Sequence, residues 1–90
     1  MNKYYTSPER ELDLHGYTKV EAEIALLEFF GNCKNDGCLK VRIITGKGLH
    51  SKNFEGVLGD HVRNFLHREK YSFKDAKIND GGSGAIIVNL

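Results

Sequence analysis

The stretch ELDLHGYTKVE, residues Glu11–Glu21, decides the fold because it joins a predicted strand to a predicted helix. Its first half alternates leucines with polar residues, the period-two pattern of a strand that buries one face. The leucines should face the core, and Asp13 and His15 the opposite side. Its second half contains TKVE, which has the form of a capping box, so a helix should begin at Thr18.

The rest of the chain continues with the same two kinds of element. The predicted strands are Glu11–His15, Leu39–Ile44, Phe73–Ile78 and Ala85–Leu90, and the predicted helices are Thr18–Lys34 and Phe54–Glu69. Strands joined through helices should run parallel, whereas the last two strands, joined by a short turn, should be antiparallel. Because both right-handed crossovers step the same way, both helices should fall on one face of the sheet. The apolar last strand belongs inside the sheet and the charged third strand at its edge, which predicts the order 1-2-4-3.

The predicted architecture is a β-α-β-α-β-β domain of the α+β class, an α/β two-layer sandwich whose four-stranded mixed sheet has one uncovered face. Periodicity predicts the core side chains. On the first helix they are Ala22, Leu26, Phe29 and Cys33, widened by Ile24, Ala25, Leu27 and Phe30, and on the second helix Leu58, Val62, Phe65 and Leu66. On the second strand, Leu39, Val41 and Ile43 should face the core, and Lys40, Arg42 and Ile44 the uncovered side.

Length and composition limit what the chain can be. Its 90 residues make one domain, with residues 1–10 predicted as a flexible lead-in and residues 11–90 as the domain. The net charge of +1 means that a face for nucleic acid would have to be local. There is no run of about 18 apolar residues and no secretion signal, so we expect a cytoplasmic protein that does not enter membranes. Cys33 and Cys38 do not form a CxxC pair and are predicted to be reduced, and we expect a monomer.

Three glycine-bearing loops should meet at one end of the sheet. They are the turn after LDLHG, the TGKG loop at residues 45–48 and the GGSG turn at residues 81–84, which brings Gly82 and Gly84 to the same rim. Open sheets of this kind place their ligands at the carboxyl ends of parallel strands. TGKG is not a P-loop, but its glycines let backbone N–H groups approach an anion beside Lys47.

The pair Asp13 and His15 at this rim has three interpretations. The two side chains can be solvated residues of an outer face, they can hold a metal, or they can act as an acid–base pair in which the carboxylate fixes the imidazole. No cofactor is identified and no dedicated two-metal site is expected, although Asp13 could hold one divalent ion such as magnesium. His50 stands in the rim loop, whereas His61 and His67 are expected to be solvated or partly packed on a helix.

Three motifs carry a resemblance to a known family. LDLHG at residues 12–16, ITGKGLHS at 44–51 and GGSGAIIVNL at 81–90 resemble, in order and spacing, the small MutS-related (Smr) domain. The resemblance covers residues 11–90. It implies a β-α-β-α-β-β sandwich similar to the C-terminal domain of translation initiation factor three. It also implies work on nucleic acid, since several members nick DNA or cleave RNA and some act on ribosomes.

The resemblance also implies which residues would take part in cleavage. They are Asp13, His15, Thr45, Gly46, Lys47 and Gly48. Many relatives carry histidine where this chain has Thr45, which puts activity in doubt if that histidine is their acid or base, and His50 is a candidate to compensate in part. The predicted function is an endonuclease that acts on RNA or DNA, and the alternative is a non-catalytic module that binds RNA, DNA or a ribosome through the same rim.

Each candidate residue has a predicted role in that mechanism. His15 would transfer a proton, Asp13 would orient it, and Lys47 would stabilise charge on the phosphate. The predicted phosphate-binding residues are Thr45, Gly46, Gly48 and His50, and the predicted contacts along the nucleic-acid backbone are Lys40, Arg42 and Lys52.

Overall fold

The elements follow the predicted order in the computed structural model, which describes residues 7–46, 55–76 and 84–90. They are β1 (Arg10–Asp13), α1 (Lys19–Asn35), β2 (Lys40–Ile44), α2 (Glu55–Arg68), β3 (Ser72–Asp75) and β4 (Ala85–Asn89). The sheet has the order β1-β2-β4-β3, with β1 and β2 parallel and β4 antiparallel to both of its neighbours. The predicted strand order is therefore confirmed.

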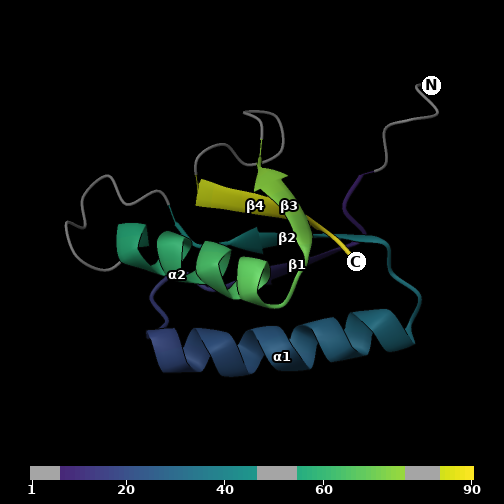
Figure 1. The fold of residues 1–90 in the computed structure, drawn as a ribbon, viewed down its shortest axis with the longest axis horizontal. Helices are drawn as coiled ribbons and strands as arrows, with labels where there is room; N and C mark the ends of the chain where they lie inside the picture. Colours follow the sequence, from purple (N-terminus) through teal and green to yellow (C-terminus); the bar gives the residue numbers. More distant parts are fainter. Residues whose placement is uncertain (1–6, 47–54, 77–83) are drawn as a thin grey trace.

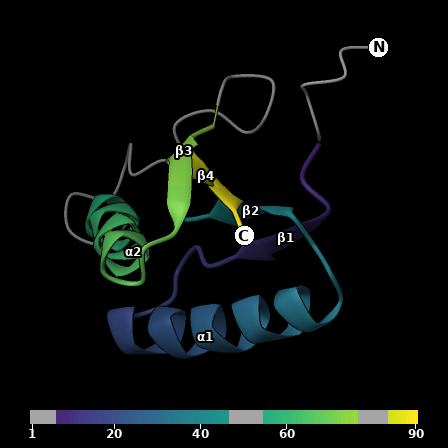
Figure 2. The same ribbon diagram turned by 45° about the vertical axis from the view of Figure 1, so that its right-hand side comes forward.

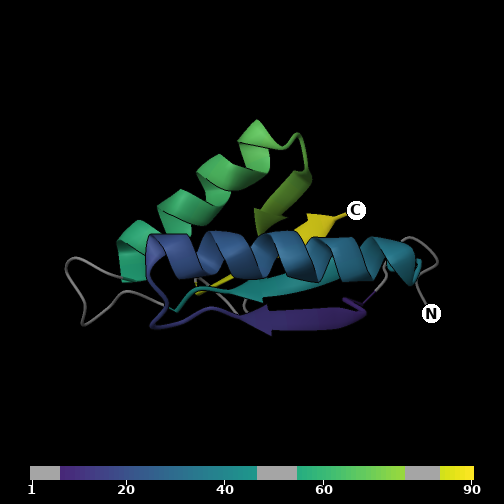
Figure 3. The same ribbon diagram turned by 90° about the horizontal axis from the view of Figure 1, so that it is seen from below.

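Both helices lie on one side of the sheet, so the molecule has two layers (Figure 1). Seen from below, α1 and α2 lie in front of the strands, and α1 runs along β1 and β2 (Figure 3). The turned view places α2 beside β3 (Figure 2), which agrees with the contacts between these two elements. In the part of the chain that the structure describes, no helix is long and apolar enough to cross a membrane.

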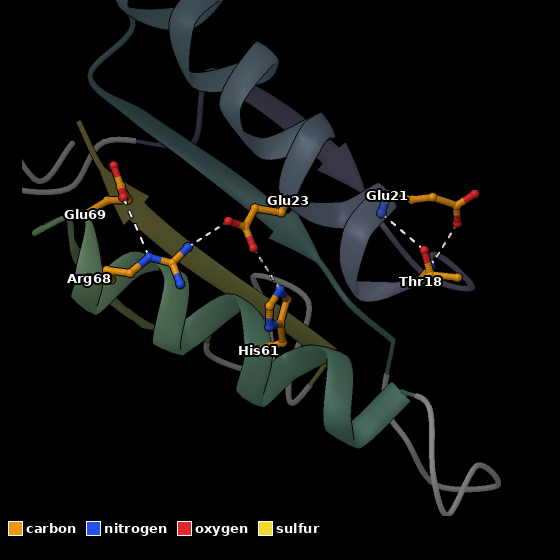
Figure 4. Close-up of polar contacts among 6 residues, drawn as sticks. All are labelled: Thr18, Glu21, Glu23, His61, Arg68 and Glu69. Carbon is orange, nitrogen blue, oxygen red and sulfur yellow. Dashed lines mark hydrogen bonds and ion pairs between the residues drawn. The ribbon is translucent and has the colours of Figure 1, made fainter.

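Helix α1 has defined ends. At the start of α1, Thr18 Oγ1 accepts a hydrogen bond from the Glu21 amide at 3.1 Å, and the Glu21 carboxylate accepts one from the Thr18 amide at 2.9 Å. This is the predicted capping box (Figure 4). At its end, the amides of Cys38 and Gly37 donate to the carbonyls of Cys33 and Lys34, with Gly37 at φ +77°. These bonds form a Schellman motif, in which glycine is the favoured left-handed residue.

The core lies between the helices and the inner sheet face. Its buried members are Leu14, Ala22, Leu26, Phe30, Cys33, Cys38, Val41, Ile43, Leu58, Val62, Phe65, Leu66, Ile86 and Val88. Full burial of a large apolar side chain stabilises the fold by about 1.5–3 kcal/mol. On the outer sheet face, Ile87 is also buried because β2 and β3 flank it on both sides.

Three residues predicted for the core lie at the surface instead. Ile24 is 64% exposed and Leu27 56% exposed, because they lie on the side of α1 largely opposite its buried residues. Leu39 is 68% exposed because β2 begins one residue later, and Cys38 is buried in its place. The last residues of the predicted lead-in, residues 1–10, belong to the folded domain. Arg10 begins β1, and the Glu9 amide donates to the Lys40 carbonyl at 2.8 Å.

Candidate functional site

A tight turn takes the chain out of the sheet directly after β1. The Tyr17 amide donates to the Leu14 carbonyl at 3.0 Å, and Gly16 has a φ of +80° at the third position of this turn. A positive φ at that position favours glycine. The Leu14 amide donates to the Ile44 carbonyl at 2.7 Å, so the start of the turn is fixed on β2. The strand therefore ends at Asp13, two residues before the predicted end.

One oxygen atom of Asp13 contacts both the backbone and the side chain of His15, the second residue of this turn. Asp13 Oδ1 accepts from the His15 amide at 3.0 Å and lies 2.7 Å from His15 Nδ1. The side-chain bond to His15, followed by the backbone bond, lowers the pKa of the Asp13 carboxyl below its ordinary value. The His15 side chain is 67% exposed and the Asp13 side chain 49% exposed, so both can be reached from solution.

The contact selects a tautomer of the imidazole. A neutral ring that donates from Nδ1 carries its lone pair on Nε2, so proton transfer would proceed through Nε2 while Asp13 holds the opposite edge of the ring. Within residues 7–46, 55–76 and 84–90, no three His, Cys, Asp or Glu side chains gather at a spacing that could hold a metal.

The second loop of the rim meets the third through backbone hydrogen bonds. The amides of Thr45 and Gly46 donate to the Gly84 carbonyl at 2.9 and 3.2 Å. The rim therefore contains Gly84, as predicted, and it joins β2 to the start of β4. The Gly46 amide is thus bonded to a carbonyl of its own chain, and the phosphate contact of Gly46 stays a prediction.

Thr45 points away from Asp13 and His15. The inward alternation of Val41 and Ile43 continues to Thr45, which is only 2% exposed. Its hydroxyl lies close to α2, since a Cβ built on Gly59 would stand 3.5 Å from Thr45 Oγ1. The hydroxyl therefore lies on the inner side of the sheet, and the phosphate contact of Thr45 stays a prediction.

Several predicted residues lie outside the described part of the chain. They are Lys47, Gly48, His50, Lys52 and Gly82. The structure brings together Asp13, His15, Gly46 and Gly84 at the rim, and it leaves Lys40 and Arg42 on the uncovered sheet face.

The uncovered sheet face has a mixed charge that the sequence prediction missed. Arg42 donates to Glu11 Oε2 at 2.7 Å, and the Arg42 side chain is 26% exposed. Beyond Arg42 in the same row across the sheet stand Ile87 and then Lys74 on β3. The alternation of the third strand could have placed Lys74 on this face. A nucleic-acid backbone on this face would meet Lys74 as well as the predicted Lys40 and Arg42.

His61 belongs to a polar network between the helices. Glu23 on α1 contacts two residues of α2 (Figure 4). Its Oε2 atom lies 3.3 Å from His61 Nε2, and its Oε1 atom accepts a hydrogen bond from Arg68 at 2.8 Å. The network lies in the helical layer, whereas Asp13 and His15 stand at the sheet rim. His61 thus joins two helices and is partly packed, as expected.

Comparison with known proteins identifies the family. The model of the Smr domain matches residues 12–90. The chain belongs to the Smr domain family. An uncharacterised protein of Treponema pallidum is 40% identical over 86 residues, which cover 92% of this chain and 42% of that protein. Endonuclease MutS2 of Finegoldia magna is 34% identical over 91 residues, or 99% of this chain and 11% of that enzyme. The chain thus spans less than half the length of these relatives.

Solved Smr structures share the fold. The Smr domain of Thermus thermophilus MutS2 superposes with a TM-score of 0.78 at 32% identity, covering 90% of this chain and 96% of that one. YdaL, a stand-alone small MutS-related protein from Escherichia coli, superposes with a TM-score of 0.84 at 27% identity, covering 94% of this chain and 67% of that one. The Smr domain is thus found both within longer chains and in stand-alone proteins.

Proposed function

We propose that this Smr domain is an endonuclease that hydrolyses phosphodiester bonds in RNA or DNA, with His15 as the proton carrier and Asp13 as its positioning residue. The observation that supports this most is the 2.7 Å contact between Asp13 Oδ1 and His15 Nδ1 on an exposed rim. The relatives named endonuclease MutS2 support the reaction class.

In the proposed reaction, His15 Nε2 takes a proton from water as the water oxygen bonds to phosphorus. The bond from phosphorus to the leaving oxygen breaks, that oxygen takes up a proton from water, and the His15 imidazolium then returns its proton to solvent. Asp13 stabilises the imidazolium between these steps. Lys47 and the Gly48 amide are proposed to hold the phosphate, a role that rests on the family resemblance and not on the described residues.

A second candidate is a non-catalytic module that binds nucleic acid or a ribosome through the same rim. It is favoured by the Gly46 amide, which is bonded to Gly84, and by the buried Thr45 hydroxyl, because both remove donors from a phosphate site. In either case the partner is nucleic acid. A ribosomal target, a cytoplasmic location and a monomeric state remain predictions.

A cleavage assay tests the proposal. The full chain is incubated with supercoiled DNA and with structured RNA, with and without a chelator, under single-turnover conditions. His15→Ala should reduce the cleavage rate by about 10²–10⁴-fold. The matched control is His67→Ala, which removes an exposed histidine at the far end of α2 and should cut at the wild-type rate.

Binding to uncut nucleic acid separates the two candidates. For an endonuclease, His15→Ala should bind nearly as well as wild type, since phosphate contacts come mainly from other residues. Undiminished cleavage by His15→Ala would refute the catalytic role. A wild-type protein that cuts nothing, together with a His15→Ala variant that loses binding, would establish the binding module.

A further inference from the structure

Helix α1 has a second apolar side that faces away from the sheet. We name it the outer seam, and it consists of Val20, Ile24 and Leu27 on the helix together with Tyr17, which precedes the N-cap residue Thr18. Tyr17 is 42% exposed, Val20 70%, Ile24 64% and Leu27 56%. A surface helix normally presents polar residues opposite its buried face. An apolar row in that position keeps about four large side chains in contact with water, which indicates a surface that binds something.

The outer seam is a concentrated feature of the surface. In the part of the chain that the structure describes, the exposed large apolar side chains are those of the seam together with Leu39. A shallow hollow in the seam is lined by Val20, Glu23, Ile24 and Leu27. Apolar side chains gathered around a hollow fit an inserted side chain, whereas scattered apolar residues would need no explanation.

The spacing of the seam matches an α-helical partner. Val20, Ile24, Leu27 and Gly31 follow one another at intervals of four, three and four residues, the heptad spacing of a helix that packs along another helix. Gly31 fits this geometry because a Cβ built on it meets nothing within 4 Å, so the position is open and small. A partner helix could approach the backbone of α1 closely there.

The acidic side chains beside the outer seam favour a partner helix with basic residues. Glu21 and Glu28 lie along one side of it, while the lysines of α1 are confined to its ends. Glu23 lies along the other side and is already paired with Arg68 at 2.8 Å. Two copies of α1 packed seam to seam would bring these carboxylates together, which disfavours a second copy of this chain. Lysine or arginine side chains at the flanking positions of the partner would complement them.

We propose that the outer seam docks an amphipathic helix of another protein, with apolar residues at heptad spacing and basic residues on the flank that meets Glu21 and Glu28. The seam faces away from the sheet, whereas Asp13 lies on the uncovered sheet face. A docked helix would therefore leave the candidate site accessible, and the partner could direct this domain to its target. The proposal does not depend on whether the domain cleaves nucleic acid.

A labelled synthetic peptide tests this surface by fluorescence anisotropy with the full chain. The probe is an amphipathic helix with leucine at the two core positions of each heptad and lysine at the flanking position that meets Glu21 and Glu28. Leu27→Gln should weaken its binding by at least about tenfold, and Glu28→Gln should weaken it by a smaller factor that shrinks as salt is added. The matched control is Leu39→Gln, which changes an equally exposed leucine outside the seam and should bind as wild type does.

Two control peptides and a sedimentation experiment can contradict the proposal. A peptide with glutamate at the same flanking position, or a scrambled peptide of the same composition as the probe, should bind at least about tenfold more weakly. Equal binding of either, or no binding of the lysine peptide, would overturn the inference. Dimerisation in sedimentation experiments that Leu27→Gln abolishes would assign the seam to a second copy of this chain instead.

Discussion

The Asp13 carboxylate connects folding and chemistry through one oxygen atom. By accepting from the His15 amide, it fixes the turn that ends β1, and by holding His15 Nδ1 it orients the ring. The backbone bond would form with any residue at position 15, whereas the ring bond needs histidine. This difference gives substitutions at the two positions different expected results.

Asp13→Asn and His15→Ala should have overlapping effects on the proposed cleavage. An asparagine oxygen can still accept a hydrogen bond, but it cannot stabilise the imidazolium as a carboxylate does. We expect the double variant to cleave no more slowly than His15→Ala alone, because the two residues act as one unit. Single-turnover rates for the three variants check this, with Asp60→Asn as a matched control on the exposed surface of α2. Losses that multiply would show that Asp13 acts on its own.

The lowered pKa of Asp13 predicts a dependence of stability on pH. Because the folded pKa lies below the unfolded value, the ionised Asp13 stabilises the fold above about pH 4, and this contribution is lost as pH falls through the folded pKa. The difference in Tm between wild type and Asp13→Asn should therefore be largest near neutral pH and should shrink in acid. Thermal melts from pH 7 to pH 2 measure it. A Tm difference that grows in acid would contradict the expected direction of the pH dependence. The change in Tm should be small because the Asp13 carboxylate is half exposed.

At the scale of single elements, α2 ends in an unfavourable backbone conformation. The amides of Tyr71 and Lys70 donate to the carbonyls of Leu66 and His67, and Lys70 takes the left-handed position with a φ of 63°. The equivalent position after α1 is Gly37. The two helices thus end in the same motif, one with glycine and one with lysine.

Lys70→Gly should stabilise the fold by about 0.5–1 kcal/mol. The left-handed conformation costs an L-residue roughly 1–2 kcal/mol, and glycine removes this cost. Part of the gain in stability is offset because glycine has more conformational freedom in the unfolded chain. Gly37→Ala is the matched opposite change, and it should destabilise the fold for the same reason. Urea unfolding of both variants gives the two free energies. A destabilised Lys70→Gly variant would show that the lysine side chain makes a contact worth more than the strain.

The sequence predicted the ends of α1 better than its faces. Thr18 and Gly37 act through local rules that involve a few neighbouring residues, so their positions could be read directly. Ile24 and Leu27 were placed in the core because α1 is apolar on both sides, and no local rule states which side meets the sheet. At the rim, the contact between Asp13 and His15 follows from strand alternation. The bond from the Gly46 amide to Gly84 depends on the start of β4 and has no local signal.

At the scale of the whole molecule, the sheet separates a helical layer from an uncovered face of mixed charge. Arg42 is already paired with Glu11, whereas Lys74 extends the basic row to β3. If nucleic acid lies on this face, Lys74→Ala should weaken binding across sequences and reduce the salt slope by about one. Glu11→Gln should strengthen binding, because it removes a negative charge beside Arg42.

Binding titrations at several salt concentrations measure both effects. Lys34→Ala is a suitable control, since Lys34 lies in the last turn of α1, in the helical layer. A salt slope unchanged by Lys74→Ala, with sequence-selective loss of affinity, would place the nucleic acid elsewhere.

Removal of residues 86–90 should unfold the domain. β4 lies between β2 and β3, and Ile86 and Val88 are fully buried in the core. Without this strand β3 loses its hydrogen-bonded neighbour in the sheet, and the inner faces of both helices lose their covering. A soluble truncated protein that melts cooperatively would contradict this expectation.

The central place of β4 also has a consequence during synthesis on the ribosome. The chain is made from its N-terminus, so β1, β2 and β3 all leave the ribosome before the strand that joins β2 to β3. Until β4 follows, the nascent chain presents two unpaired strand edges and an open apolar layer, the features that recruit chaperones and promote aggregation. The 14 residues from the end of β3 to the end of β4 take roughly 1–3 s to add at about 5–20 residues per second, so this vulnerable interval is brief only where translation does not pause. Slow codons within the last strand would lengthen it and lower the yield of folded protein.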